Sequence, residues 1–340
     1  MGLAVLLSVV LTACGERRNL SPTRAYQELT GFAMGTTWSL KYEGSTNPDD
    51  SKALRKSLDD RLEELENQMS TWREDSQISR FNATRSTNWF PVSADMVRVV
   101  AAAELVSRKT DGAFDITTYP LVRLWGFGSA EVPDELPDTE AIAAARRAVG
   151  YRNLEHRKDP PGLRKSLAEL QIDVSAIAKG FAVDQLVEMM ERGACTNYLV
   201  EIGGELRASG QREQGGPWRV GIEDPVVGKS RIEEVLPLKN AALASSGDYR
   251  NFLDINGRRF AHIVDPKSGR PLPQRDLAVS VLRDNCMSAD AWATALTVLG
   301  PQAGLEIANS NGLPVMFRHR MNGTIKVLDS EHWPARPGSD

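Results

Sequence analysis

Cysteine is scarce in this sequence, with three residues in a chain of 340. Cys14 stands far from Cys195 and Cys286, and no CxxC pair occurs. These spacings speak against a zinc site built on thiolates. The odd number also means that the three thiols cannot all pair with one another. Cys195 and Cys286 could form a disulfide in an oxidising compartment, or each could be buried as a thiol.

The two familiar nucleotide-binding loops are absent, because no GxGxxG follows a predicted strand and no GxxxxGKS/T occurs. Positive charge is not in excess either: 41 Lys and Arg stand against 45 Asp and Glu, for a net charge of −4. This balance argues against a nucleic-acid partner, which favours a clearly basic surface. With 41% hydrophobic and 25% charged residues, the composition is typical of a soluble globular protein.

Apolar runs long enough to span a membrane are also missing, and the nearest candidate, Leu3 to Leu11, is too short. This run ends in Leu11-Thr12-Ala13-Cys14-Gly15, which resembles a bacterial lipobox, where the signal is cut before a cysteine whose thiol is acylated. We therefore predict a lipoprotein signal peptide over residues 1–13 and a tether over residues 14–29. A lipidated Cys14 would anchor the protein at the periplasmic, extracytoplasmic face of a bacterial membrane.

An alternative interpretation of the N-terminus is a plain secretory signal with an incidental cysteine. The lipoprotein interpretation is favoured because the cysteine falls where the apolar run stops. One feature departs from the usual signal pattern: no Lys or Arg precedes the run, which leaves room for a start upstream of Met1.

The remaining pattern predicts an α+β fold of mixed helices and antiparallel-rich sheets, because helices and strands alternate without a regular βαβ order. Apolar residues at helical spacing predict helices, and these cover Ser51 to Met69, Ala94 to Lys109, Thr139 to Val149, Ala176 to Arg192, Ala289 to Leu299 and Pro301 to Asn309. Strands are expected at Ala33 to Tyr42, Leu170 to Val174, in short segments from Tyr198 to Ile263, and in a hairpin of Leu313 to Phe317 and Thr324 to Leu328. A single domain over residues 30–328 with a polar, frayed tail over 329–340 follows.

Asp290 and Thr294 are four residues apart, so a helix places them on one face among small alanines. A carboxylate and a hydroxyl together offer the hard oxygens that magnesium or calcium prefers. The competing interpretation is an Asp that favours the helix dipole and a Thr that bonds back to the backbone. Spacing alone favours this second, structural interpretation.

Asp173 ends a predicted strand, a tight turn follows, and Lys179 is expected in the first turn of the next helix. Backbone N–H groups at a helix start, together with a cation, form an anion site. Asp173 would then bind a ribose or ring group, and Lys179 a phosphate. Alternatively, Ser175 is an ordinary N-cap and Lys179 is solvated.

Two further segments are candidates for ligand binding. The first segment mixes small residues, aromatics and an acid, and its pattern is not that of a regular helix; it covers Thr110 to Thr117 and continues at Leu124 to Gly128. It could wrap a flat aromatic ligand or simply form a core loop. His262, beside a strand-ending Asp265-Pro266 turn, could accept a proton, although a lone histidine is more often structural.

Taken together, these stretches resemble the ApbE family, the FAD:protein FMN transferases. The motifs that carry the resemblance occur in order along about Thr30 to Leu328; they are Met34-Gly35-Thr36-Thr37, Met69-Ser70-Thr71-Trp72, Phe81-Asn82, Thr110 to Thr117 with Trp125 to Gly128, Asp173 to Asp184, Gly203-Gly204-Glu205, Trp218 to Pro225, Ser246 to Tyr249, His262 to Pro271, and Ala289 to Leu296. Each motif alone is too short to identify a family, but the whole set in this order is specific to this one. The resemblance implies a single ApbE-like, T-fold-related catalytic domain.

The resemblance also implies roles for individual residues. The expected FAD contacts are Met34, Trp72, Ala113, Phe114, Asp115, Asp173, Lys179, His262 and Ile263. The expected metal ligands are the main-chain oxygen of Ala176 and the side chains of Asp290 and Thr294, with Mg²⁺ as the ion and Ca²⁺ as an alternative. His262, Asp290 and Lys179 are the expected catalytic residues, and either His262 or an unliganded carboxylate would take the proton of the attacking hydroxyl.

The implied reaction moves FMN from FAD, the substrate, to a Thr or Ser hydroxyl of an acceptor protein and releases AMP. The acceptor would belong to an extracytoplasmic or membrane redox complex. Two alternatives stay open: the same site could pass FMN to water as an FAD pyrophosphatase, or the protein could be a non-enzymatic periplasmic lipoprotein that binds FAD. A metal site argues against the second alternative, because storage needs no catalytic metal.

Overall fold

A computed structural model describes residues 24–128, 133, 135–225, 232–248, 252–255, 258–321 and 323–335. The predicted signal peptide, Cys14 and the first part of the tether lie outside these ranges. Within them, no helix has both the length and the apolar character needed to span a membrane. Cys195 and Cys286 are both buried free thiols, so the fold does not pair them.

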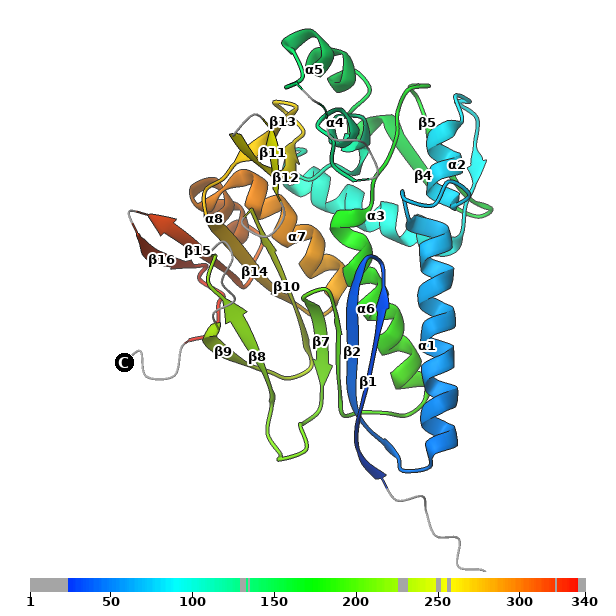
Figure 1. The fold of residues 1–340 in the computed structure, drawn as a ribbon, viewed down its shortest axis with the longest axis vertical. Helices are drawn as coiled ribbons and strands as arrows, with labels where there is room; N and C mark the ends of the chain where they lie inside the picture. The colour runs from blue at the N-terminus through cyan, green and yellow to red at the C-terminus, as the bar shows by residue number, and fades with distance from the viewer. Residues whose placement is uncertain are drawn as a thin grey trace, which may run out of the picture.

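The centre of the molecule is an eight-stranded sheet in the order β1-β2-β6-β7-β10-β14-β15-β16 (Figure 1). Every neighbouring pair is antiparallel, which confirms the α+β prediction. The strands are β1 (Arg24–Ala33), β2 (Thr36–Ser45), β6 (Tyr198–Ile202), β7 (Glu205–Ser209), β10 (Ala241–Gly247), β14 (Leu277–Arg283), β15 (Val315–Met321) and β16 (Thr324–Asp329).

Helices cover one face of this sheet and build the main core. The strands bury alternate residues against them, for example Trp38 and Leu40 of β2 and Val279 and Val281 of β14, as expected for strands with one face on the core. The helices are α1 (Pro48–Met69), α2 (Gln77–Ala83), α3 (Ala94–Lys109), α6 (Ser175–Arg192), α7 (Cys286–Leu299) and α8 (Pro301–Ser310). Figure 1 shows α6 and α7 side by side behind the middle of the sheet, and the two helices are in contact.

Smaller elements complete the fold. The hairpin of β8 (Trp218–Glu223) and β9 (Ile232–Leu238) encloses a second core around Trp218 and Met316. Two three-stranded sheets lie outside the main one: β3 (Phe90–Pro91), β5 (Pro161–Lys165) and β4 (Leu154–Lys158); and β11 (Phe252–Ile255), β12 (Arg258–Asp265) and β13 (Arg270–Pro273). Short helices α4 (Tyr119–Leu124) and α5 (Thr139–Arg146) and the 3₁₀ turns η1 (Ile116–Thr118) and η2 (Tyr151–Asn153) link these parts.

Local signals explain where the helices begin and end. The structure confirms the predicted α3 at both ends, where Ser93 caps its first turn by accepting the N–H of Met96. Helices α1 and α7 begin earlier than predicted, because Asn47 and Asn285 act as N-caps outside the apolar pattern. Helix α5 ends at Arg146, three residues before the predicted Val149, and its last backbone bonds are of the tighter 3₁₀ type.

Four predictions about extended segments and chain ends are corrected. The strand predicted from Ala33 is a hairpin whose turn lies at Met34 and Gly35, both with positive φ. Strand β1 begins at Arg24, so the domain includes residues assigned to the tether. Leu170 to Val174 belongs to no sheet. At the other end, Ser330 and Trp333 are buried and hydrogen-bonded, so this part of the tail is not frayed.

Candidate active site

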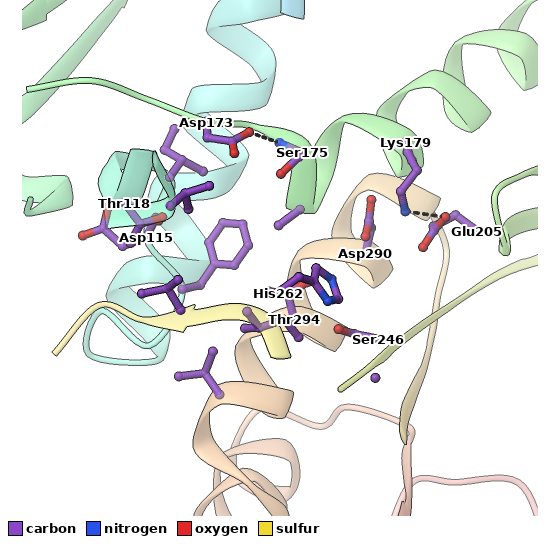
Figure 2. A pocket seen from close by; sticks show the side chains of 18 of the residues that line it. Asp115, Thr118, Asp173, Ser175, Lys179, Glu205, Ser246, His262, Asp290 and Thr294 are labelled. Atoms are coloured by element: carbon purple, nitrogen blue, oxygen red, sulfur yellow. Dashed lines mark hydrogen bonds and ion pairs between the residues drawn. The ribbon is translucent and has the colours of Figure 1, made fainter. Parts of the chain in front are cut away.

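A cavity of about 560 Å³ lies where the two central helices meet the sheet and strand β12. Its walls come from the β1–β2 turn, the segment before α4, the start of α6, β7, the end of β10, β12 and α7. Eleven of the twelve residues expected at the site line it; they are Met34, Ala113, Phe114, Asp115, Asp173, Ala176, Lys179, His262, Ile263, Asp290 and Thr294. Segments more than 200 residues apart in the sequence therefore converge on one cavity (Figure 2).

Close packing of α6 on α7 brings the charged residues together. A Cβ atom added at Gly180 of α6 would lie 2.4 Å from the carbonyl oxygen of Cys286 and 2.8 Å from the Cβ of Asp290. Only glycine fits this crossing, because such contacts are shorter than real Cβ atoms show. The Gly180 N–H donates to Asp290 Oδ2 over 2.9 Å. Asp290 is thereby fixed beside the first turns of α6.

The same contact bears on the carbonyl oxygen of Ala176. A helical N–H ordinarily donates to the carbonyl four residues earlier, and for Gly180 that acceptor is Ala176. The Gly180 N–H donates to Asp290 Oδ2, and a carbonyl oxygen has two lone pairs in any case. The Ala176 oxygen can therefore accept a further partner from the cavity.

The residues present fit a divalent cation. Buried Asp290 offers a carboxylate, Thr294 a hydroxyl and Ala176 a carbonyl oxygen, all on the cavity wall. Throughout the described ranges, no cluster of three or more His, Cys, Asp or Glu could enclose a metal ion by itself. Such an ion would therefore complete its coordination with water and substrate oxygens, as magnesium prefers.

Lys179 does not stand alone in the cavity. It is the fifth residue of α6, in the second turn rather than the predicted first, and its Nζ lies 2.6 Å from Glu205 Oε2 (Figure 2). The interpretation of Lys179 as a solvated side chain is thus wrong. Although burial opposes its charge, the carboxylates of Asp290 and Glu205 raise the pKa of Lys179, so it stays protonated.

Burial has the opposite effect on the two carboxylates. It raises the pKa of Asp290 against the effect of Lys179, and it raises the pKa of Glu205 to about 7 although the Lys179 ammonium lowers it. The side chain of Glu205 is 5% exposed, so little water reaches it. Two acids share one ammonium in this cavity, which leaves an excess of negative charge when both acids are ionised and so favours binding of a cation.

Asp115 and Asp173 shape the opposite wall of the cavity. Asp115 caps η1 by accepting the N–H of Thr117 over 2.8 Å, and its other oxygen accepts the N–H of Tyr151 over 2.9 Å. Asp173 Oδ1 accepts the N–H of Ser175 over 2.8 Å at the start of α6 (Figure 2). Val174 is the N-cap of α6, and Asp173, rather than Ser175, supplies the side-chain oxygen for its first N–H. Asp115 mainly holds the loop that carries Ala113 and Phe114.

A buried amide holds the segment before α6. Asn82 Nδ2 donates to the Ile172 carbonyl oxygen over 2.8 Å, while the Ile172 N–H donates to Asn82 Oδ1 over 2.7 Å. The next N–H, that of Asp173, donates to the carbonyl oxygen of Ile116. These bonds replace the strand ladder predicted for Leu170 to Val174, because a side chain and a loop supply the partners.

We expect Asn82→Ala to destabilise the fold by about 2 kcal/mol, because it leaves a buried N–H and a buried carbonyl of Ile172 without partners. Urea unfolding would measure this loss. Asn88→Ala, in an exposed turn, is the control and should change the free energy of unfolding little. Equal stability of the two variants would contradict the bridging role of Asn82.

Comparison with known proteins places this geometry in a family. Residues 34–317 match the ApbE family. The chain belongs to the ApbE family. It is 42% identical over 289 residues to the FAD:protein FMN transferase of Vibrio cholerae serotype O1, a match that covers 85% of this chain and 86% of the relative. The corresponding protein of Haemophilus influenzae is 39% identical over 335 residues, with 96% and 95% covered.

Solved ApbE structures have the same fold. The flavin transferase ApbE from Vibrio cholerae superposes with a TM-score of 0.83 at 39% identity, covering 92% of this chain and 99% of that one. The apo form of the Pseudomonas stutzeri flavinyl transferase ApbE gives a TM-score of 0.81 at 38% identity, covering 91% and 96%. The predicted ApbE resemblance is confirmed.

Trp72 is the expected ApbE contact that the structure does not place in the cavity. Its side chain is 70% exposed, and it is not among the lining residues. It follows α1, whose last turn is tied to the site because Glu66 accepts the Met34 N–H over 2.6 Å. Trp72 therefore does not line the cavity in this structure, and its contact with FAD stays a prediction, whereas the Met34 turn is held in place.

Several lining residues were not assigned roles from the sequence, notably Glu205 and Ser246. Glu205 appeared only as part of the Gly203-Gly204-Glu205 motif, and nothing local marks it as the partner of Lys179. Gly203 has a positive φ, and a Cβ there would lie 2.8 Å from the Thr36 side chain. The Gly203-Gly204 pair was therefore the sequence feature that could have predicted a tight turn beside the site.

Proposed function

We propose that this protein is an FAD:protein FMN transferase, which moves FMN from FAD to a Thr or Ser hydroxyl of an acceptor protein. The observation that carries the proposal is the convergence of Ala176, Lys179, Asp290 and Thr294 on one cavity, in a member of a family whose relatives have this name. A diphosphate needs both an ammonium and a metal-binding oxygen set nearby, and this cavity supplies them.

In the proposed reaction, the acceptor hydroxyl oxygen forms a bond to the phosphorus on the FMN side of the FAD diphosphate. The bond from that phosphorus to the bridging oxygen breaks, and AMP leaves with the electron pair. Lys179 lines the cavity, and its ammonium would stabilise charge that develops on the phosphate oxygens. A divalent cation, Mg²⁺ or Ca²⁺, held by Asp290, Thr294 and the Ala176 carbonyl, would neutralise further charge when bound.

The hydroxyl proton must pass to a base, and two groups on the cavity wall are candidates. His262 of β12 lies on the same side of the cavity as Asp290 and Thr294 (Figure 2). Glu205 is a carboxylate outside the metal-binding set, on the Lys179 side of the cavity, and its pKa of about 7 suits proton transfer at neutral pH. Ala113, Phe114 and Ile263 supply apolar wall on which the flavin would rest.

The test is incubation with FAD, Mg²⁺ and a redox-complex subunit that offers a Thr or Ser acceptor, followed by intact mass analysis and AMP detection. We expect the acceptor to gain one FMN and AMP to appear in equal amount. Loss of both products with EDTA would support the metal requirement. FMN and AMP without a modified acceptor would indicate a pyrophosphatase, and bound FAD without AMP would indicate a non-enzymatic binding lipoprotein.

We also propose that the protein is anchored through lipidated Cys14 at the extracytoplasmic face of a bacterial membrane. The support is the lipobox-like Leu11 to Gly15, which lies outside the described residues. Cys14→Ser should move the expressed protein from the membrane fraction to the soluble fraction or leave its signal uncut. A mature, secreted protein that retains Met1 to Ala13 would contradict the assignment.

A further inference from the structure

Asp184, in the third turn of α6, makes three hydrogen bonds with groups outside its own helix. Its Oδ1 accepts the N–H of Cys286 over 2.9 Å and the Nη1–H of Arg207 over 3.0 Å, and its Oδ2 accepts the N–H of Met287 over 2.9 Å. The residue is 5% exposed. It does not line the cavity, so it is not a substrate contact.

These bonds complete the N-terminus of α7. The first N–H groups of a helix have no partners within it. The side chain of the N-cap residue Asn285 accepts the N–H of Ser288 over 2.9 Å. Asp184 provides acceptors for the two preceding N–H groups, and its negative charge lies favourably at the positive end of the helix dipole.

The second contact between the helices lies one turn away along both of them. Gly180 is four residues before Asp184 in α6, and Asp290 is four residues after Cys286 in α7. The Gly180 N–H donates to Asp290 Oδ2 over 2.9 Å. Together with the close packing of the two helices, these two polar contacts one turn apart define the rotation of α7 and its shift along α6.

We propose that Asp184 is a positioning residue that holds Asp290 and Thr294 of α7 at the correct separation from Ala176 and Lys179 of α6. This inference rests on the proposed function, because the separation matters for a metal-bound diphosphate. Bonds that orient metal-ligating groups strongly affect metal affinity: loss of such a partner typically weakens it by about 10–100-fold.

The test compares Asp184→Asn with Asp224→Asn. Asp224 is also a buried aspartate paired with an arginine, since its Oδ1 accepts the Nε–H of Arg318 over 2.9 Å. Unlike Asp184, it binds Arg318 of β15 rather than α7, and it does not line the cavity. An asparagine at 184 has one acceptor oxygen, and its NH₂ would face an N–H donor of α7. We expect both variants to lose thermal stability.

Two measurements separate positioning from capping: flavin fluorescence as FAD binds with and without Mg²⁺, and the Mg²⁺ concentration that gives half-maximal thermal stabilisation of the FAD complex. For Asp184→Asn we expect this concentration to rise about 10-fold or more, with FAD binding in the absence of Mg²⁺ nearly unchanged. Asp224→Asn should keep the Mg²⁺ response of the unsubstituted protein.

Asp184→Glu serves as a second variant if the asparagine does not fold. Glutamate keeps the charge and both oxygens, so it still caps α7, but its extra methylene displaces the helix. We expect a raised Mg²⁺ requirement here as well. Unchanged Mg²⁺ responses in a folded Asp184 variant would overturn the inference and leave Asp184 as a cap only. No Mg²⁺ response in the unsubstituted protein would instead contradict the metal assignment in the proposed function, and this inference with it.

Discussion

Asp290→Asn is expected to lower FMN transfer by about 10²–10³-fold at limiting Mg²⁺, the scale for removing one electrostatic group from a transition state. The change keeps the size of the side chain, and its remaining oxygen can still accept the Gly180 N–H that Asp290 Oδ2 accepts over 2.9 Å. The fold should therefore survive, while the charge that would hold the cation is lost. Steady-state transfer across a Mg²⁺ titration measures the effect.

Excess Mg²⁺ should restore part of the activity of Asp290→Asn, because Thr294 and the Ala176 carbonyl still shape the site. Thr294→Val is the milder companion, since it removes a neutral oxygen. If Asp290 only stabilised the helix, Asp290→Asn would leave the rate of FMN transfer nearly unchanged. The structure weakens that alternative: α7 begins at Cys286 and is capped by Asn285, so Asp290 lies in the second turn. Full activity at limiting Mg²⁺ would contradict the metal assignment.

Local sequence patterns predicted those elements whose stability is largely local. Helix α3 has an apolar face, a Ser93 cap and a basic last turn, and the prediction matched both ends. The pairing of Asp290 with Thr294 on one helical face also needed only a spacing of four. Spacing alone, however, favoured a structural role for this pair, and the ApbE resemblance was needed to favour a site.

The predictions that failed depend on partners distant in sequence. Leu170 to Val174 has the composition of a strand. The side chain of Asn82, 90 residues before Ile172, makes the backbone hydrogen bonds that a neighbouring strand would have made. The local pattern ran the predicted strand through the turn at Met34, because a non-glycine residue with positive φ carries no strong signal. Glu205 pairs with Lys179 across two elements, α6 and β7, so no local pattern revealed it.

Lys179→Met is the second substitution with a large expected effect, because it removes an ammonium from both the proposed transition state and its ion pair with buried Glu205. We expect transfer to fall by about 10²-fold or more. Glu205 and Asp290 are then left buried without their cation. Removal of one partner of a buried pair should cost about 3 kcal/mol of stability where the remaining acids are ionised.

The stability loss should depend on pH with a definite sign. The pKa of Glu205 in the folded protein is about 7, above its usual value of 4.5, and without the Lys179 ammonium it should rise further. A folded state that holds a proton longer than the unfolded state loses stability as pH rises between the two pKa values. Lys179→Met should therefore be nearly as stable as the unsubstituted protein near about pH 5, and clearly less stable near about pH 8.

The double variant Lys179→Met/Glu205→Gln separates the two roles of the lysine. Glutamine cannot ionise, so the buried negative charge of Glu205 is gone and the part of the stability loss that Glu205 causes near neutral pH should return. Transfer should not return, because no ammonium remains to stabilise the diphosphate. Urea unfolding at several pH values and mass analysis of the acceptor measure the two quantities. If the double variant regained transfer, Lys179 would serve only to neutralise Glu205, and the proposed role of its ammonium at the phosphate would be wrong.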